Sequence, residues 1–197
     1  LRLSDAMRAV EDEEAALAAS LPLVSDDVGG ARVSYCEIGE DADRILSVHT
    51  YPPGSAIHPT RLSDFGRQTR DRKVDGESVV IADIETDPLL EETERRALRS
   101  VGIRSLACVP LHQKGRLVAL ICLHSNAPRV WTREETRLVE GAGERIWSDV
   151  ARCRARAAQR RFARLVESSQ EFIGMCDENL VPYYVNATGL QLAGLRD

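Results

Sequence analysis

The feature that most constrains this chain is a predicted helix of about ten turns, from Thr132 to about Ser169. The segment contains no proline, and its two glycines, Gly141 and Gly143, lie near its start. At about 1.5 Å per residue such a helix is roughly 55 Å long, more than a domain of this size covers with its own surface. A helix of this length typically joins two domains and pairs with a copy of itself. The sequence therefore predicts a relay between modules.

Charge and hydropathy exclude several classes of protein. The chain has 197 residues and a formal net charge of −5, which argues against a dedicated nucleic-acid binder. No apolar run approaches the ~20 residues that cross a bilayer, so we expect no membrane insertion and a cytoplasmic location. The first residue is Leu1 rather than a methionine, and we expect the chain to be part of a longer protein.

Apolar periodicity and turn residues divide the first 125 residues into short elements. We expect helices over 4–21, 64–73 and 87–100, and strands over 32–38, 44–51, 78–84, 103–112 and 116–125. Pro22 and the cluster Asp26 to Gly30 are expected to end the first helix, and Gly102 to cap the third. The last two strands flank Gln113-Lys114-Gly115 and are apolar on both faces, which places them at the centre of a covered sheet. Hairpins with helices before, between and after predict an α+β fold.

Three segments carry a resemblance to a known family. They are VVIADIETDP (79–88), SLACVPLHQKGRLVALICLHS (105–125) and WTREETRLVEGAGERI (131–146). In this order and spacing they resemble the GAF domain family, with the likeness running over about 4–157 and the domain assigned to 1–157. The resemblance implies a central antiparallel sheet with the first and last helices together on one face. It also implies that a ligand pocket, where there is one, lies on the other face.

The end of the chain carries a second resemblance. The segment RFARLVESSQEFIGMCDENLVPYYVNATGLQLAGL (161–195) resembles the opening of a PAS domain, of which about a third is present. A GAF domain, a connecting helix at 132–169 and a PAS fragment at 170–197 form an arrangement typical of bacterial sensor histidine kinases. The segments SYCEI, DFG and LHSNAPRVWTREE resemble GAF domains of the HWE class of these kinases. This implies that the fragment is not itself an enzyme and that downstream PAS and kinase domains receive its signal.

A small-molecule site is expected between the sheet and the segment 52–104. The candidate lining residues are Tyr35, His58, Asp64, Phe65, Asp83, Arg104 and Cys122. They mix apolar walls with a few polar groups, as small-molecule sites do, although strand register decides which of them point inward. Thr86, Asp87 and Thr93 stand where nucleotide-binding members contact the purine and ribose. Asp87 followed by Pro88 is better explained as a helix cap.

The five cysteines are expected to be reduced and free of metal, and no covalent cofactor is expected. Their number is odd and no CxxC pair occurs, and no histidine lies three or four residues from another, so a helical metal pair is absent. With a hairpin loop of two to four residues, Cys108 lies opposite a residue near 119 to 121, and Cys122 is not directly opposite it. We interpret both as small apolar core residues.

The long helix carries an apolar seam that predicts a parallel homodimer. Spacings of three and four join Val139, Ala142, Ile146, Val150, Cys153 and Ala157. The seam then changes register to Ala158, Phe162 and Leu165, a stutter in the helix pair. The arginines between Arg152 and Arg164 are interpreted as a solvated face flanking that pair, not as a nucleic-acid site.

Together these patterns predict the sensory module of a two-component sensor histidine kinase. A ligand or partner acts on the GAF pocket, and the dimeric helix relays the signal. The alternative is a ligand-free dimerisation spacer in another signalling protein, such as a cyclase or transcription regulator. A GAF-type free methionine sulfoxide reductase needs reactive cysteines in the pocket loops, and 86–104 contains none. A bilin photoreceptor usually needs a pocket cysteine followed by histidine, which no cysteine here is, and the signature of cyclic-nucleotide binders is not found.

Overall fold

The computed structural model describes residues 12–53 and 61–195. The chain divides into two compact units, Leu1–Ala151 and Arg152–Asp197, and the helix α5 (Arg133–Glu167) contributes residues to both. Among the described residues, no helix combines the length and apolarity that a bilayer span requires. The long helix expected from Thr132 to about Ser169 is confirmed to within two residues at each end.

The first unit is built on an antiparallel sheet of five described strands in the order β2-β1-β5-β4-β3. The strands are β1 (Arg32–Ile38), β2 (Ile45–Tyr51), β3 (Val79–Ile81), β4 (Ser105–Gln113) and β5 (Arg116–Ser125). β5 lies in the middle with β4 beside it, and both are buried along most of their length. The α+β fold and the central place of this apolar hairpin are therefore confirmed.

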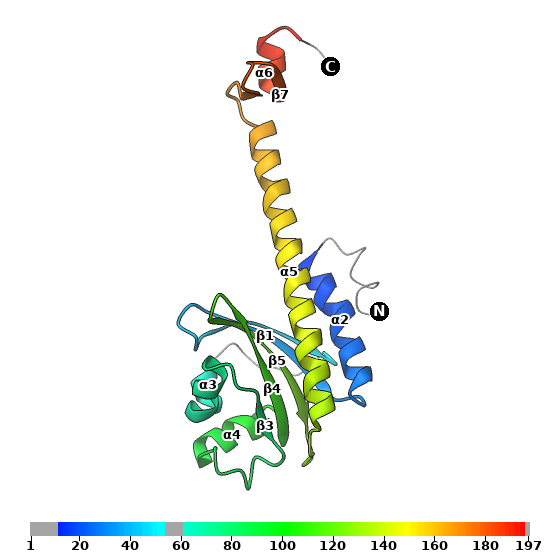
Figure 1. Ribbon diagram of the computed structural model, residues 1–197, viewed down its shortest axis with the longest axis vertical. Helices are drawn as coiled ribbons and strands as arrows, with labels where there is room; N and C mark the ends of the chain where they lie inside the picture. Colours follow the sequence, from blue (N-terminus) through cyan, green and yellow to red (C-terminus); the bar gives the residue numbers. More distant parts are fainter. Residues whose placement is uncertain (1–11, 54–60, 196–197) are drawn as a thin grey trace. The chain divides into compact units, whose positions relative to one another are not determined.

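One face of the sheet is covered by α2 (Glu13–Asp27) and the first half of α5 (Figure 1). Leu17 and Val24 of α2 and Ile146 of α5 belong to one buried cluster with inward-facing residues of β1, β4 and β5. α5 packs tightly on the sheet at Gly143, where an added Cβ would lie 2.8 Å from Cγ2 of Ile121. The first and last described helices thus share a face, as expected.

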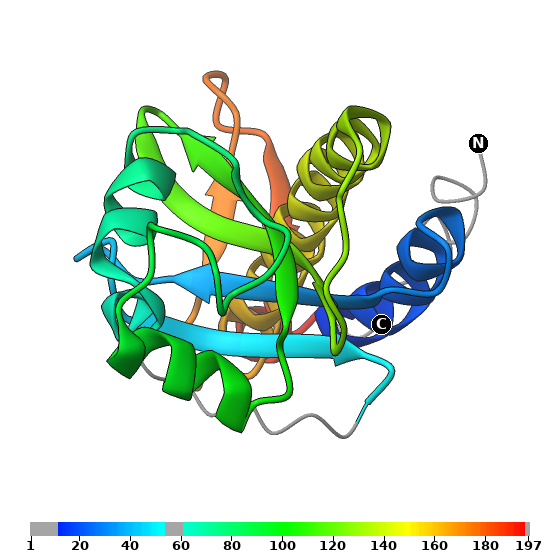
Figure 2. The same cartoon turned by 90° about the horizontal axis from the view of Figure 1, so that it is seen from below.

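The other face is covered by the 3₁₀ helix η1 (Leu62–Phe65) and the helices α3 (Arg67–Val74) and α4 (Glu92–Ser100) (Figure 2). The buried Glu94 side chain accepts hydrogen bonds from the Arg67 amide at 2.9 Å and the Glu91 amide at 2.8 Å, so one carboxylate caps both helices. Between η1 and α3, Gly66 has φ +130°, and a Cβ there would lie 2.5 Å from Thr69 Oγ1. Only glycine permits this junction.

Two expected helix boundaries are wrong. Pro22 lies inside α2 rather than at its end, because burial of the apolar residues on both sides of it, Leu17, Leu21 and Val24, outweighs the lost backbone hydrogen bond. The helix ends instead at Asp27, within the expected cluster Asp26 to Gly30. The expected start of this helix, at residue 4, lies outside the described residues. Asp87 accepts from the Leu89 amide in a turn and does not cap α4, which begins five residues later, at Glu92, behind a Glu91–Glu94 capping box.

The second unit contains the end of α5, the hairpin β6 (Gly174–Cys176) and β7 (Pro182–Val185), and α6 (Ala187–Leu192). Its organising side chain is the fully buried Asn186. The Asn186 amide donates to the carbonyls of Val166 and Glu171 at 3.1 and 2.9 Å, and its oxygen accepts from the amides of Ile173 and Gly189. One asparagine thus ties the end of α5 to the hairpin and to α6.

Candidate functional site

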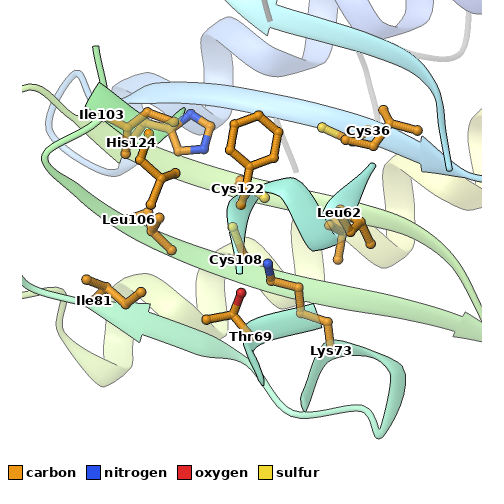
Figure 3. Close-up of a pocket in the computed structure, with 14 residues that line it drawn as sticks. Cys36, Leu62, Thr69, Lys73, Ile81, Ile103, Leu106, Cys108, Cys122 and His124 are labelled. Atoms are coloured by element: carbon orange, nitrogen blue, oxygen red, sulfur yellow. The ribbon is translucent and has the colours of Figure 1, made fainter. Parts of the chain in front are cut away.

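A cavity of about 60 Å³ lies between the sheet and the helices η1, α3 and α4 (Figure 3). Its walls are mainly apolar and include Ile45, Leu62, Phe65, Ile81, Leu106 and Leu120. One water needs roughly 10–15 Å³ of such volume. Pockets for drug-sized ligands reach roughly 300–1,000 Å³. As bounded by the described residues, the cavity has room for an ion or a ligand of a few heavy atoms.

The polar groups of this cavity come from α3 and the central strands. Thr69 and Lys73 are four residues apart on α3 and therefore share the face that lies on the sheet. Lys73 is 5% exposed, and none of the ion pairs among the described residues includes it. Figure 3 shows its amino group directed toward Cys108. Burying an ammonium group without a carboxylate costs free energy, and a negative charge nearby would lower that cost.

Strand alternation places three thiols and one imidazole on the cavity side. Cys36 lies on β1, Cys108 on β4, and Cys122 and His124 on β5, all with 7% exposure or less. Cys108 and Cys122 are directly opposite each other. The Cys108 and Cys122 sulfurs and a His124 ring nitrogen lie within 4.8 Å of one another.

The expectation that Cys122 does not lie opposite Cys108 is therefore wrong. The hairpin turns at Lys114 and Gly115, which both have positive φ, and this two-residue turn alone would pair Cys108 with residue 121. An irregularity between Leu111 and His112 shifts the register by one residue and brings the two cysteines together. Both are free thiols in this structure.

The thiols differ in their ionisation. The Cys122 thiol, as a hydrogen-bond donor, lowers the pKa of Cys108 well below its usual range, and Lys73 and His124 act in the same direction. The same interaction, with burial, raises the pKa of Cys122. Burial raises the pKa of Cys36 to about 12, with a further contribution from Cys108. The surroundings therefore favour ionisation of Cys108 over that of Cys122 and Cys36.

The predicted lining residues divide between the cavity and other places. Phe65 and Cys122 line it. Tyr35 does not: it lies on the opposite face, in the core beneath α2 and α5, because the alternation of β1 puts its neighbour Cys36 on the cavity side. His58 lies outside the described residues.

The remaining predicted residues lie outside this lining. Asp64 lines a separate, open and polar hollow of about 420 Å³, together with Arg67 and Thr93. Asp83 and Arg104 form an ion pair with 2.7 Å between Oδ1 and Nε, and the hydrogen bond from Arg104 lowers the pKa of Asp83. These polar groups stabilise loops and do not enter the cavity.

Sequence reasoning named neither Lys73 nor His124 as a lining residue. A usable signal existed for His124, which is two residues from Cys122 on one strand and so shares its face. Lys73 had no such signal, because its place over the cavity depends on how α3 packs on the sheet.

The predicted dimer seam is largely buried by the chain itself. Val139, Ile146 and Val150 are 0% exposed within the core of the first unit, and Cys153 is 3% exposed. Ala142 is half-buried against the same core. The prediction that these residues contact a second copy is therefore wrong. Their spacing of three and four marks the face of the helix that lies on the sheet. The homodimer itself stays a prediction.

The connection from β5 to α5 is held by Arg129. Its amide donates to the Ala82 carbonyl and its guanidinium to the Val28 carbonyl, both at 2.9 Å. The guanidinium also pairs with Glu135 in the first turn of α5 and lies 4.3 Å over the Trp131 ring. Thr132 and Glu135 cap the helix reciprocally. Arg129 thus joins the segment after β5 both to the sheet side of the domain and to the first turn of α5.

Comparison with known proteins places this geometry in a family. A model of the family described as GAF domain matches residues 12–150. No curated protein matches the chain.

Solved structures with the same fold include free methionine-R-sulfoxide reductase from Neisseria meningitidis in complex with its substrate. It has 16% identity and a TM-score of 0.61, with 78% of this chain and 86% of that chain covered. A domain of a protein assigned as a two-component sensor histidine kinase from Sinorhizobium meliloti 1021 has 16% identity and a TM-score of 0.58, with 78% and 99% covered. At these identities the likeness shows the fold alone. Since the family match spans more than half of the sequence, this chain belongs to the GAF domain family.

Proposed function

We propose that this chain is the sensory module of a two-component sensor histidine kinase. Occupancy of the cavity changes the position of the start of α5, and α5 passes the change to the segment that resembles a PAS domain and on to a kinase domain. The observation that supports this most is continuity. Cys122 and His124 line the cavity from β5, and β5 leads through the short segment 126–132 directly into α5.

The relay requires that β5 and α5 move together. Arg129 fixes the segment between them to the backbone of Val28 and Ala82, and Gly143 lets α5 contact Ile121 of β5 closely. Tightly packed elements respond to a local change by shifting between discrete arrangements rather than by deforming continuously. A ligand that favours one arrangement shifts the equilibrium by its difference in affinity for the two.

The second half of α5 supports a parallel homodimer as the state that relays the signal. Among the described residues, 154–165 of α5 are all exposed, and Phe162 and Leu165 are 63% and 65% exposed. These two and Ala158 form the apolar seam after the predicted change of register. Light scattering at tens of micromolar protein should give the mass of a dimer. A monomer at that concentration would remove the paired helix from the proposal.

A cavity-filling variant tests the relay without a known ligand. Leu106→Phe adds volume inside the cavity, while Leu46→Phe makes the same change at a side chain that is 54% exposed. Spin labels at Arg160→Cys, in a Cys176→Ser background because Cys176 is an exposed thiol, report the distance between paired α5 helices. Leu106→Phe should shift the distance distribution and, in the full-length protein, the rate of autophosphorylation, whereas Leu46→Phe should change neither. If Leu106→Phe folds and leaves both unchanged, the domain is a spacer.

A further inference from the structure

The cavity contains a set of side chains with metal-ligand geometry. Cys108 and Cys122 are opposite each other on β4 and β5, and His124 is the next residue of β5 on the same face. The two sulfurs and one ring nitrogen lie within 4.8 Å of one another. Around one ion, bonds of about 2.3 Å to sulfur and about 2.0–2.1 Å to nitrogen put ligand atoms roughly 3.5–4 Å apart. Small rotations of side chains on neighbouring strands close that difference.

A supporting contact orients the imidazole. Ser34 lies opposite Cys122 on β1, and its hydroxyl is 3.4 Å from Nδ1 of His124 and 3.1 Å from the hydroxyl of Thr50. Histidines that bind metals commonly use their second nitrogen in such a contact, which fixes the tautomer and the ring orientation. With Nδ1 engaged by Ser34, Nε2 of His124 is the nitrogen left for an ion.

Charge decides which ion fits. Two thiolates and a neutral imidazole around a monovalent ion carry a charge of −1, and the Lys73 ammonium beside them brings the buried total to zero. Around a divalent ion the same ligands are neutral, and the ammonium of Lys73 is left without a counter-charge. An uncompensated buried charge is strongly unfavourable. The site therefore favours a monovalent ion.

The ligand set agrees with that choice. Thiolates are soft ligands that select Cu(I) or Zn(II), and imidazole suits both. Structural zinc sites almost always have four protein ligands, whereas this cluster of described residues offers three. We propose that Cys108, Cys122 and His124 form a three-coordinate site for the cuprous ion, with Lys73 as the balancing charge. The inference rests on the proposed sensory role in that it names the occupant of the same cavity.

Binding is tested by titrating the purified, reduced full chain with Cu(I) under anaerobic conditions, in competition with a chromophoric cuprous chelator. One ion per chain should bind and should not be displaced by equimolar Zn(II). Cys108→Ala and Cys122→Ala should each weaken binding by at least about tenfold to hundredfold, the range that loss of a supporting contact alone costs a metal site. Cys36→Ala, an identical change in the same cavity, should keep the ion, as should Cys176→Ser.

Further measurements keep the proposal falsifiable if a ligand variant does not fold. X-ray absorption at the copper edge of the loaded wild-type protein should show two sulfur ligands and one nitrogen. Lys73→Met retains all three ligands and should lower the preference for Cu(I) over Zn(II) by about tenfold or more. No binding, displacement by Zn(II), or an equal loss in Cys36→Ala would each overturn the site.

The two proposals fail separately. If Cu(I) binds as described but leaves the α5 distances and autophosphorylation unchanged, the site stands and the sensory role falls. If Leu106→Phe shifts α5 while Cu(I) does not bind, the sensory role stands and the cuprous site falls.

Discussion

Gly143→Ala tests the close packing of α5 on the central strand, on which both the fold and the relay depend. The added Cβ would lie 2.8 Å from Cγ2 of Ile121 and 3.1 Å from Cδ2 of Leu111. Cγ2 of Ile121 cannot rotate away independently, because it is one branch of a stiff β-branched side chain in a fully buried strand. Overpacking of this kind typically costs about 1–3 kcal/mol.

The matched control is Gly141→Ala on the same helix. Within the described ranges 12–53 and 61–195, no heavy atom outside the local backbone lies within 4 Å of the Cβ that this substitution adds. Both variants gain the same helix propensity, up to about 1 kcal/mol. The difference between their free energies of unfolding therefore isolates the packing term. We expect Gly141→Ala to be the more stable by about 1–3 kcal/mol.

Urea unfolding followed by tryptophan fluorescence measures this difference. The chain has two tryptophans: Trp131 belongs to the core of the first unit, and the partly buried Trp147 packs against that core. Their emission therefore reports that unit without a signal from the second. In thermal unfolding the same difference corresponds to roughly 2–4 °C per kcal/mol. Equal stabilisation by both alanines would refute the close approach of α5 to β5.

Three further outcomes follow from buried or paired groups. Ile146→Glu puts a charge into a core position that is 0% exposed, so we expect the variant to be unfolded under conditions in which the wild type is folded. A folded monomer with native tryptophan emission would instead show that Ile146 contacts a second copy. Asn186→Ala removes the hydrogen bonds that join α5, β6 and α6, so the Ile173 and Gly189 amides should exchange hydrogen faster, by about 1–3 kcal/mol of lost protection, whereas the exposed Asn179→Ala should change little. The pKa of Asp83 is lowered by the hydrogen bond from Arg104, so its stabilisation is present above about pH 4, the unfolded pKa, and is lost as the pH falls through the lower folded pKa. Arg104→Met should flatten the acid side of the curve of melting temperature against pH, and an unchanged curve would contradict that assignment.

The sequence located the secondary structure well where the signal is local. The strands Arg32–Ile38 and Arg116–Ser125 were predicted with these same bounds, and the turn between β4 and β5 within a residue. Alternation, turn residues and apolar runs depend on neighbours in the chain. The helix start at Asp87 was wrong because the cap comes from the pair Glu91 and Glu94 instead.

The candidate site was harder to predict because it depends on register between strands. A single irregularity beside His112 moves Cys122 opposite Cys108, and no residue in the hairpin signals it. On β1, the alternation of side chains between the two faces of the sheet puts Cys36 rather than Tyr35 on the cavity side. Phe65 and Cys122 were named correctly as lining residues, but Lys73 became visible as a partner only when α3 was placed over the sheet.

The prediction that the seam of α5 pairs with a second copy was wrong for a different reason, and this reason refines the proposed relay. A spacing of three and four describes any helix face that packs, whether a sheet or a second helix covers it. In α5 the positions up to Cys153 are buried within the chain, and those beyond it are exposed. The predicted change of register falls just after this point, between Ala157 and Ala158. The helix therefore changes its surroundings along its length: its first half lies on the sheet, and its second half exposes Ala158, Phe162 and Leu165. In the relay that we propose, a signal from the cavity would enter α5 through its contacts with the sheet and leave through pairing of the exposed half with a second copy.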